Sequence, residues 1–231
     1  MVLQPESIAA RPSGLFIVFE GGDGAGKSTQ SARLASWLVD QGWQVRTTFE
    51  PGDTAMGADI RQLVLHSPVP LSPRAEFLLY AADKAQHVAD VVGPALASGQ
   101  IVICDRYVDS TIAYQGAGRT LPDADISRIA WWSVSGLVPD LTVLMDVPVS
   151  EGLGSKDQLD RMESDGDEFH ARVRQRFLGL AAAEPSRYLV VNGRGPKDDV
   201  TAQICQRVAQ LIASACHTLA RDDAAGTPAS E

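Results

Sequence analysis

The sequence predicts an α/β fold, in which a parallel β-sheet carries helices on both faces. Two observations support this prediction. Short, almost continuously apolar segments of strand length alternate along the chain with longer segments whose apolar residues recur at helical spacing. Strands that are apolar on both sides must be covered on both sides, as in the parallel sheets of α/β proteins. The 231 residues, 45% of them hydrophobic, are enough for one such domain.

Five segments are predicted as strands because each is a short apolar run of the kind that a sheet buries. The first, LFIVFE, ends in a glycine-rich turn. The third, QIVICD, and the fourth, LTVLMDV, are also dominated by apolar residues. The predicted strands span 15–20, 43–49, 100–105, 141–147 and 187–191.

Helices are predicted where apolar residues recur every three or four positions between these strands. Leu34 and Leu38 mark one face of the first helix, and Ile126 and Ala130 mark one face of the third. Pro94 is expected to kink or break the second helical segment, because its ring clashes with the preceding turn. The predicted helices span 27–41, 73–97, 123–135, 168–183 and 198–219.

The two ends of the chain differ from this pattern. Residues 1–14 and 221–231 are polar or rich in small residues and are expected to be flexible tails around one domain at 15–220. The formal net charge of −9 disfavours a nucleic acid as a partner, since such binders usually carry a basic surface. The sequence shows neither an apolar run of about 20 residues nor a secretory signal, so we expect a cytoplasmic protein without a membrane partner.

A glycine-rich segment, GGDGAGKST, follows the first predicted strand. It matches the phosphate-binding pattern G-x-x-x-x-G-K-[ST] and lies, as required, between a buried strand and an amphipathic helix. Glycines allow the tight turn that wraps backbone N–H groups around a phosphate, and the helix dipole adds to the attraction. The lysine is expected to reach the β- and γ-phosphates and the serine hydroxyl to bind Mg²⁺. This predicted nucleoside-triphosphate site comprises Gly21, Gly22, Asp23, Gly24, Ala25, Gly26, Lys27, Ser28 and Thr29.

Polar residues also follow the third predicted strand, in the segment DRYVDSTIAYQG. Asp105 ends that strand, where P-loop proteins place a carboxylate that organises the metal. Arg106 comes next, at the edge of the sheet where ligands bind in α/β proteins, and its guanidinium suits a phosphate. Two hydroxyls, a phenol and an amide follow at Ser110, Thr111, Tyr114 and Gln115.

Taken together, these motifs resemble the thymidylate kinase family. The resemblance rests on EGGDGAGKST at 20–29, EPGDT at 50–54, LLYAADKAQHV at 78–88, DRYVDSTIAYQG at 105–116 and DRME at 160–163. It implies transfer of the γ-phosphoryl group of ATP to dTMP in the presence of Mg²⁺, giving ADP and dTDP. It also implies a P-loop fold with a five-stranded parallel sheet, a mobile lid, which falls at about 148–166, and a homodimer.

The resemblance further implies roles for individual residues of this chain. Asp23 is expected to contact the sugar of dTMP and to organise the acceptor phosphate, which Arg106 is expected to bind. Arg106 is also expected to act with Lys27 on the transferring group. Tyr80 is expected to stack on thymine. The other contacts to the base and the sugar are assigned to Lys84, Ser110, Thr111, Tyr114 and Gln115.

The sequence departs from the family pattern at three places. Phe49 precedes EPGDT where many members carry an arginine that touches the dTMP phosphate, and Arg74 is a candidate to replace it. Lys84 stands where the family has an arginine that contacts the base. The lid is short and poor in arginine, so Arg161 in DRME is expected to supply its catalytic charge. The alternative candidates for this charge are two arginines of the following predicted helix, Arg172 and Arg174.

The adenine contact and the activity leave alternatives open. The loop NGRG after the last predicted strand is expected to lie beside adenine with Arg194 stacked on the base, although a plain polar turn explains the same residues. The chain is alternatively a deoxynucleoside kinase, which needs a carboxylate base near a hydroxyl acceptor, or a nucleotide-binding protein without catalysis. Arg106 favours a phosphate acceptor, and the intact Lys27, Ser28 and Asp105 favour an active enzyme.

Overall fold

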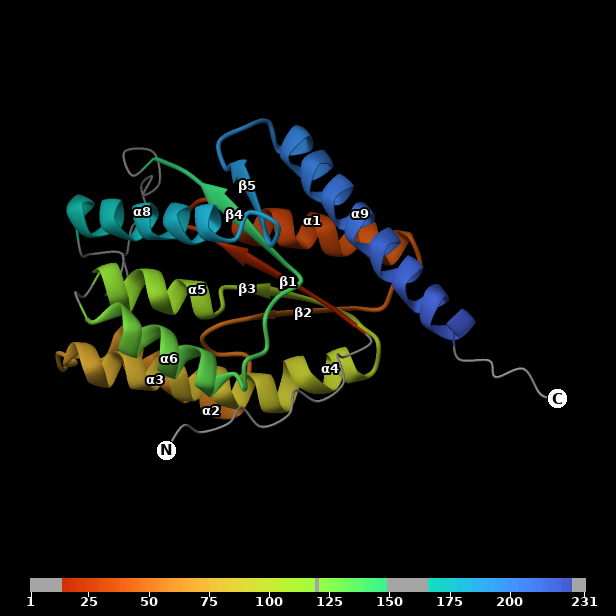
Figure 1. Ribbon diagram of the computed structural model, residues 1–231. Helices are drawn as coiled ribbons and strands as arrows, with labels where there is room; N and C mark the ends of the chain where they lie inside the picture. Colours follow the sequence, from red (N-terminus) through yellow and green to blue (C-terminus); the bar gives the residue numbers. More distant parts are fainter. Residues whose placement is uncertain (1–13, 119–120, 149–165, 226–231) are drawn as a thin grey trace.

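The computed structural model describes residues 14–118, 121–148 and 166–225, which form a five-stranded sheet flanked by helices (Figure 1). All neighbouring strands are parallel, and the order across the sheet is β2-β3-β1-β4-β5. This arrangement confirms the predicted fold class. The strands are β1 (Leu15–Glu20), β2 (Val45–Phe49), β3 (Ile101–Asp105), β4 (Leu141–Asp146) and β5 (Tyr188–Asn192).

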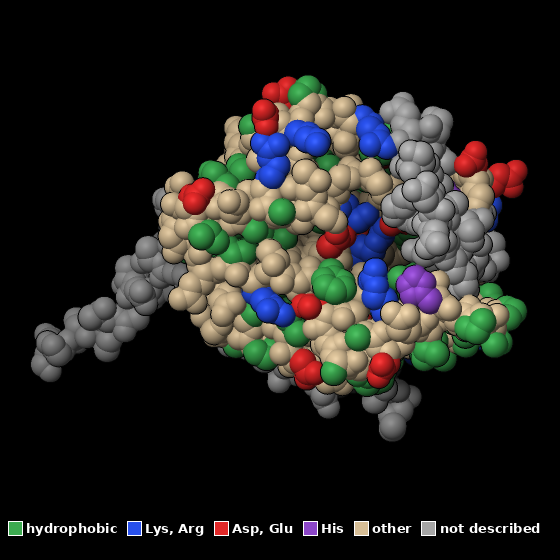
Figure 2. All heavy atoms as spheres, turned by 180° about the vertical axis from the view of Figure 1, so that it is seen from behind, with side chains coloured by type: hydrophobic (Ala, Val, Ile, Leu, Met, Phe, Trp, Pro, Cys, Tyr) green, Lys and Arg blue, Asp and Glu red, His purple; other side chains and the backbone are tan. Residues whose placement is uncertain are grey.

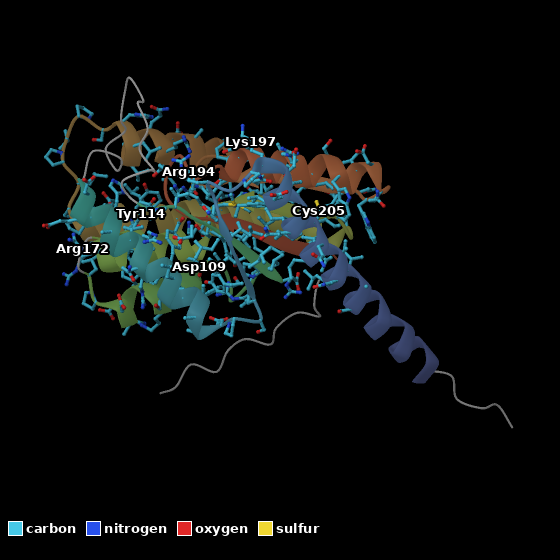
Figure 3. The ribbon with its side chains drawn as sticks, turned by 90° about the horizontal axis from the view of Figure 1, so that it is seen from above. Asp109, Tyr114, Arg172, Arg194, Lys197 and Cys205 are labelled. Atoms are coloured by element: carbon cyan, nitrogen blue, oxygen red, sulfur yellow. The ribbon has the colours of Figure 1, made fainter. Side chains whose placement is uncertain are left out.

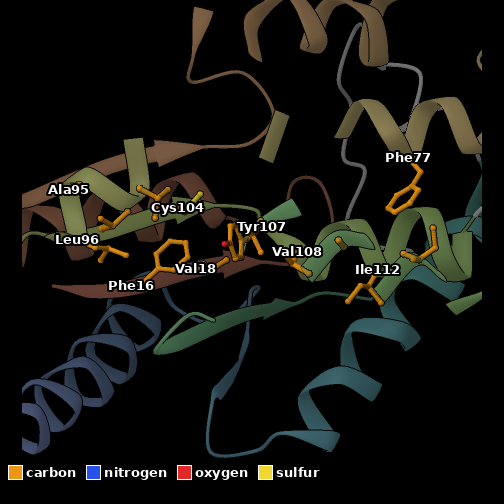
Figure 4. Close-up of a cluster of buried hydrophobic side chains, with 14 residues drawn as sticks. Phe16, Val18, Phe77, Ala95, Leu96, Cys104, Tyr107, Val108 and Ile112 are labelled. Atoms are coloured by element: carbon orange, nitrogen blue, oxygen red, sulfur yellow. The ribbon is translucent and has the colours of Figure 1, made fainter. Parts of the chain in front are cut away.

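The three central strands are buried along almost their whole length, which explains why their sequences are nearly continuous apolar runs. Successive side chains of β1 point to opposite faces of the sheet. Phe16 and Val18 join one hydrophobic cluster, which is drawn in Figure 4, whereas Ile17 and Phe19 join the cluster on the other face. The sheet therefore has a core on each side.

Helices α1 (Lys27–Asp40) and α9 (Lys197–Ala225) cover one face of the sheet and contact each other. Their buried side chains include Leu34 and Leu38 from α1 and Ile204 and Val208 from α9. The other face is covered by α3 (Pro73–His87), α4 (Gly93–Ala97), α5 (Val108–Thr111), α6 (Asp123–Ser133) and α8 (Asp167–Ala183), and α2 (Ala55–His66) packs on α3.

Two short π-helical segments interrupt the helices of this second face, namely η1 (Val88–Val92) and η2 (Ile112–Gly118). The predicted helical segment at 73–97 is therefore α3, η1 and α4 in succession, with Pro94 in the first turn of α4. The chain stays helical across these three elements, and the irregularity expected near Pro94 is the π-helical segment η1, which ends two residues before the proline.

The structure differs from the sequence-based expectations in two respects. Helix α2 was not predicted, and α9 continues to Ala225, past the domain end expected at residue 220. The expected lid falls mostly on residues 149–165, which lie outside the described residues. Within the described ranges, every helix is either too short or too polar to cross a lipid bilayer.

Candidate active site

The loop between β1 and α1 has the conformation that its glycines predict. Gly21 and Gly26 have positive φ angles of 130° and 92°, which residues other than glycine rarely adopt. A Cβ atom on Gly21 would also lie 2.4 Å from the carbonyl oxygen of Met145 in β4. Only glycine at position 21 therefore allows the loop to pass this close to β4. The loop ends at the N-terminus of α1, where backbone N–H groups without a partner inside the helix attract anions.

Lys27 begins α1 and folds back over this loop. Its Nζ donates to the carbonyl oxygens of Gly21 at 3.0 Å and Gly22 at 2.8 Å. Burial and the neighbouring Arg106 lower the pKa of Lys27 to about 8. These two carbonyl oxygens therefore hold the ammonium over the loop, and the oxygens of an anionic ligand can take their place.

Ser28 and Asp105 form a pair of oxygen donors beside the loop. The Ser28 hydroxyl donates to Asp105 Oδ2 at 2.9 Å, although the two residues come from α1 and β3. Hydroxyl and carboxylate oxygens are ligands that suit Mg²⁺, which usually keeps several waters and adds substrate phosphates. The donor set at this position therefore fits the metal predicted from the sequence.

Arg106 has a strained backbone and a fully engaged side chain. Its φ of 71° lies in the left-handed region, and its N–H donates to the carbonyl oxygen of Phe19 at 2.9 Å. The guanidinium donates to Asp23 Oδ1 at 2.7 Å, to Ser110 Oγ at 3.0 Å and to the Gly21 carbonyl oxygen at 3.2 Å. Burial raises the pKa of Asp23, but Arg106 and Lys27 outweigh it and hold that pKa well below its usual range.

Two cavities meet at this arginine. The first, which we call the P-loop cavity, is lined by residues 23–29 together with Asp105, Arg106 and Arg61. The second, which we call the Tyr80 cavity, shares Asp23, Glu50, Arg61 and Arg106 with the first. It brings together all eight residues predicted to bind the acceptor, namely Asp23, Tyr80, Lys84, Arg106, Ser110, Thr111, Tyr114 and Gln115. One face of the molecule shows a recess in which basic and acidic side chains meet (Figure 2).

The ring of Tyr114 lies between the arginine and helix α8. Its centroid is 5.2 Å from the guanidinium carbon of Arg106 and about as far from two aromatic rings of α8, at 6.0 Å from Phe169 and 6.2 Å from Phe177. The phenol donates to Asp23 Oδ2 at 3.2 Å. Tyr114 therefore has little freedom to move, and it forms a rigid wall of the Tyr80 cavity.

Lys84 is buried and ion-paired. Its Nζ lies 2.7 Å from Glu50 Oε2, and the other carboxylate oxygen lies 2.7 Å from Nδ1 of His87. Burial raises the pKa of Glu50, but Lys84 and His87 outweigh it, so the carboxyl group is held below its ordinary pKa. Glu50, His87 and Cys104 are close enough to hold a metal ion, but the Lys84 ammonium already neutralises this group and burial keeps the Cys104 thiol protonated.

Arg61 is a residue of the cavities that sequence reasoning missed. It lies on α2, and its NH1 donates to the carbonyl oxygen of Pro51 at 2.7 Å. Its guanidinium carbon is 5.7 Å from the centroid of the Phe49 ring. Arg74, the expected substitute for the missing arginine, is exposed at the start of α3, whereas Arg61 lines both cavities. The cation beside Phe49 is thus Arg61.

The other candidate arginines occupy different places. Arg194 lies in the loop before α9, near Lys197 (Figure 3), and its NH1 donates to the carbonyl oxygen of Gly24 at 3.4 Å. Arg174 forms a two-pronged ion pair with Asp146, with nitrogen–oxygen distances of 2.7 and 2.8 Å. Arg172 is exposed on α8. Arg161 lies outside the described residues.

Comparison with known proteins agrees with this geometry. A family model described as thymidylate kinase matches residues 19–204. Thymidylate kinase from Cutibacterium acnes is 57% identical over 201 residues, which are 86% of this chain and 98% of that protein. The thymidylate kinase of Clavibacter michiganensis subsp. michiganensis is 50% identical over 206 residues, 87% of this chain and 98% of that protein. The chain belongs to the thymidylate kinase family.

A solved structure of the family shows the same fold. The crystal structure of thymidylate kinase from Ehrlichia chaffeensis matches with a TM-score of 0.72 at 32% identity, and the match covers 86% of this chain and all of that one. Family membership confirms the resemblance inferred from the motifs and makes the chain a kinase, a phosphotransferase of nucleotide biosynthesis. It favours a phosphate acceptor over the hydroxyl acceptor of a deoxynucleoside kinase.

Proposed function

We propose that this member of the thymidylate kinase family transfers the γ-phosphoryl group of ATP to the phosphate of dTMP, giving ADP and dTDP. The observation that carries the proposal is that Asp23 and Arg106 line both cavities at once. A donor phosphate held by the P-loop and an acceptor phosphate held in the Tyr80 cavity would meet at these two side chains. Arg106, rather than a carboxylate base, is the group expected for a phosphate acceptor.

The P-loop cavity is the proposed site for ATP. The backbone N–H groups of residues 21–29 would hold its phosphates at the N-terminus of α1, and Lys27 would exchange the carbonyl oxygens of Gly21 and Gly22 for phosphate oxygens. Ser28 and Asp105 would hold Mg²⁺, which neutralises charge on the phosphates when it is bound. Arg194 contacts Gly24 and would lie beside the adenine.

The Tyr80 cavity is the proposed site for dTMP. Arg106 would bind its phosphate, with Arg61 as a second cation, and Tyr80 would stack on the thymine. Asp23, which is ion-paired with Arg106, would position that arginine and contact the sugar. Thr111 and Gln115 line the same cavity and would contact the edge of the base, with Lys84 beside them. Tyr114 would lie against the sugar, where a ring leaves little room for a ribose 2′-hydroxyl.

Catalysis in this arrangement depends on positioning and on charge. Phosphoryl transfer passes through a loose transition state, so the enzyme has little covalent work to do. Arg106 lies where the two cavities meet, and Lys27 donates to the same Gly21 carbonyl oxygen as Arg106 does. Arg161 stays our candidate for an additional charge from the lid. The bidentate pair with Asp146 makes Arg174 the weaker of the alternatives on α8, since that pair would have to open first.

We also propose that two copies of the chain associate through α2, α3 and α6. These helices form one layer, because α3 contacts both α2 and α6. Each carries a large exposed apolar side chain, namely Leu63, Leu78 and Trp132, of which Trp132 is 79% exposed. Exposed apolar groups on neighbouring helices commonly mark a protein interface. Analytical ultracentrifugation should show a dimer that Trp132→Asp weakens and Trp43→Asp leaves intact; a parent protein that sediments as a monomer contradicts the proposal.

An ADP-release assay with ATP and Mg²⁺ tests the proposed activity, with dTMP, dUMP, UMP and thymidine as parallel acceptors. We expect the highest turnover on dTMP, none on thymidine, and loss of turnover when the metal is chelated. Turnover on thymidine but not on dTMP would instead establish a deoxynucleoside kinase. Binding of ATP without turnover on any acceptor would establish a protein that binds nucleotide without catalysis.

A further inference from the structure

Glu20 is a buried carboxylate to which neither the sequence analysis nor the proposed function assigns a role. It is the last residue of β1 and has no exposed surface. Its Oε1 accepts from the backbone N–H groups of Tyr107 at 2.8 Å and Ser110 at 3.0 Å, and its Oε2 accepts from the Ser110 hydroxyl at 2.5 Å. All three donors belong to the segment that follows β3 and leads into α5.

This segment begins with the strained backbone of Arg106. A left-handed conformation costs a residue other than glycine on the order of 1–3 kcal/mol and persists only where the surroundings hold it. Glu20 binds the N–H of the next residue, Tyr107, and thereby fixes the chain directly after the strained position. The same carboxylate binds the N–H and hydroxyl of Ser110, in the short helix α5.

The side chain of Ser110 continues this contact toward the cavities. Its hydroxyl donates to Glu20 and accepts from NH1 of Arg106 at 3.0 Å, and NH2 of the same guanidinium donates to Asp23. A hydrogen-bonded chain thus runs from Glu20 through Ser110 to Arg106. Glu20 itself is not among the residues that line either cavity.

We infer that Glu20 is a positioning residue, which holds Arg106 in the geometry that binds the acceptor phosphate. This inference rests on the proposed role of Arg106. Glu20 acts on both parts of the arginine, because it fixes the backbone through Tyr107 and the guanidinium through Ser110. Its removal should therefore weaken binding of the acceptor and leave binding of ATP nearly unchanged, since the P-loop holds ATP through other groups.

Steady-state kinetics on Glu20→Ala, Glu20→Gln and Ser110→Ala test the inference. We expect Glu20→Ala to raise the KM for dTMP roughly tenfold or more, as for loss of hydrogen bonds to a charged group, with the KM for ATP within about twofold. Glu20→Gln should recover part of the loss, because its amide oxygen still accepts from backbone N–H groups. A matched control is Asp140→Asn, since Asp140 accepts from the backbone N–H of Phe16 at the other end of β1.

A double-mutant cycle separates positioning from a general structural role. If Glu20 acts through Arg106, Glu20→Gln should change dTMP affinity by less than about twofold once Arg106→Ala is present. Calorimetry measures this affinity even when turnover is lost. The inference would be overturned if the effects of Glu20→Gln and Arg106→Ala on dTMP affinity simply multiplied. It would also be overturned if the Glu20 variants raised the KM for ATP as much as the KM for dTMP.

The same cycle distinguishes failure of this inference from failure of the proposed function. An Arg106→Ala variant that binds dTMP as tightly as the parent contradicts the proposed role of Arg106. If Arg106→Ala binds dTMP poorly but the Glu20 variants bind it normally, only the inferred role of Glu20 is contradicted. Ser110→Ala keeps the Glu20 carboxylate but removes the hydroxyl that joins it to Arg106. Because Ser110 also lines the Tyr80 cavity, this variant is measured in the same cycle, and its effect on dTMP affinity should be less than about twofold once Arg106→Ala is present.

Discussion

The guanidinium of Arg61 lies 5.7 Å from the centroid of the Phe49 ring, and its NH1 donates to the Pro51 carbonyl oxygen at 2.7 Å. The ring and the carbonyl oxygen hold the arginine at a position where it lines both cavities. We predict that Arg61→Ala raises the KM for dTMP roughly tenfold, because a hydrogen bond between charged groups contributes on the order of 1.5–3 kcal/mol. Steady-state kinetics at saturating ATP measure this effect.

Two variants show whether the effect comes from this position. Arg46→Ala removes a cation that pairs with Asp53 on the same stretch of chain, and it should leave the KM for dTMP unchanged. Phe49→Leu removes the ring but keeps an apolar side chain, so it should raise the KM less than Arg61→Ala does. A normal KM in Arg61→Ala would show that Arg61 does not contact the acceptor.

The contrast between Arg61 and the P-loop shows what the sequence can predict. The glycines, Lys27 and Ser28 were found because a short contiguous pattern encodes the whole loop. Arg61 lies on α2, which was not predicted because prolines at 51, 68 and 70 flank a short segment and Gly57 interrupts it. The signals in that segment were the Thr54 side chain, which accepts from the N–H of Gly57, and the spacing of Ile60 and Val64.

Buried polar groups were harder still to predict. The central strands were found because burial on both faces leaves a continuous apolar run, as in β1 and β3. Glu20 ends such a run, and its partners Tyr107 and Ser110 are 87 and 90 residues away along the chain. Such long-range pairs leave no local pattern, so the contacts of Glu20 can be seen only in the folded chain, where the segment after β3 lies at the end of β1.

Tyr114 is predicted to discriminate against ribonucleotides. Its ring is fixed between Arg106 and the aromatic side chains of α8, so it cannot move aside for a 2′-hydroxyl. We expect Tyr114→Ala to lower the ratio of kcat/KM for dUMP to that for UMP roughly tenfold, since these acceptors differ only at the 2′ position. Parallel kinetics on the two acceptors measure the ratio.

Tyr114→Phe is the matched control for this prediction. It keeps the ring and loses only the phenol that donates to Asp23. Discrimination between dUMP and UMP should persist, although the phosphate site loses one hydrogen bond. If Tyr114→Ala still rejected UMP as strongly as the parent, the steric explanation would be wrong.

Lys84 is predicted to matter for stability as well as for binding. Lys84→Met leaves Glu50 buried without its ammonium partner, and breaking a buried pair in this way costs about 3–5 kcal/mol. Urea denaturation should show this loss in the free energy of unfolding, and adding Glu50→Gln should restore part of it. Lys84→Arg keeps the charge, and calorimetry then shows whether an arginine fork tightens dTMP binding.

An exposed ion pair provides the comparison for the loss at Lys84. Arg33 pairs with Asp198 between α1 and α9, and the Asp198 side chain is 88% exposed. Arg33→Ala should change the free energy of unfolding by less than about 1 kcal/mol, since solvent screens such pairs. Similar losses for Arg33→Ala and Lys84→Met would mean that burial of the Lys84 pair is not what makes it strong.

Glu20 is predicted to make stability depend on pH. Burial and the neighbouring Asp109 raise its pKa from 4.5 to about 7, against the attraction of Arg106. The folded protein therefore binds this proton more tightly than the unfolded chain does. Unfolding releases the proton between these two pKa values, so the free energy of unfolding should fall as pH rises from about 4.5 to 7, by roughly 3 kcal/mol.

Glu20→Gln isolates this contribution, because all other titrating groups remain in both proteins. The free energy of unfolding of the variant, minus that of the parent, should increase between pH 5 and pH 8 and then level off. Urea denaturation at several pH values measures both curves, and parallel curves would contradict the raised pKa. Since Gln carries no charge to bury, the variant should gain stability above pH 7 while it loses affinity for dTMP. Such a result would mean that the ionised Glu20 carboxylate lowers the stability of the protein but positions Arg106 for binding of dTMP.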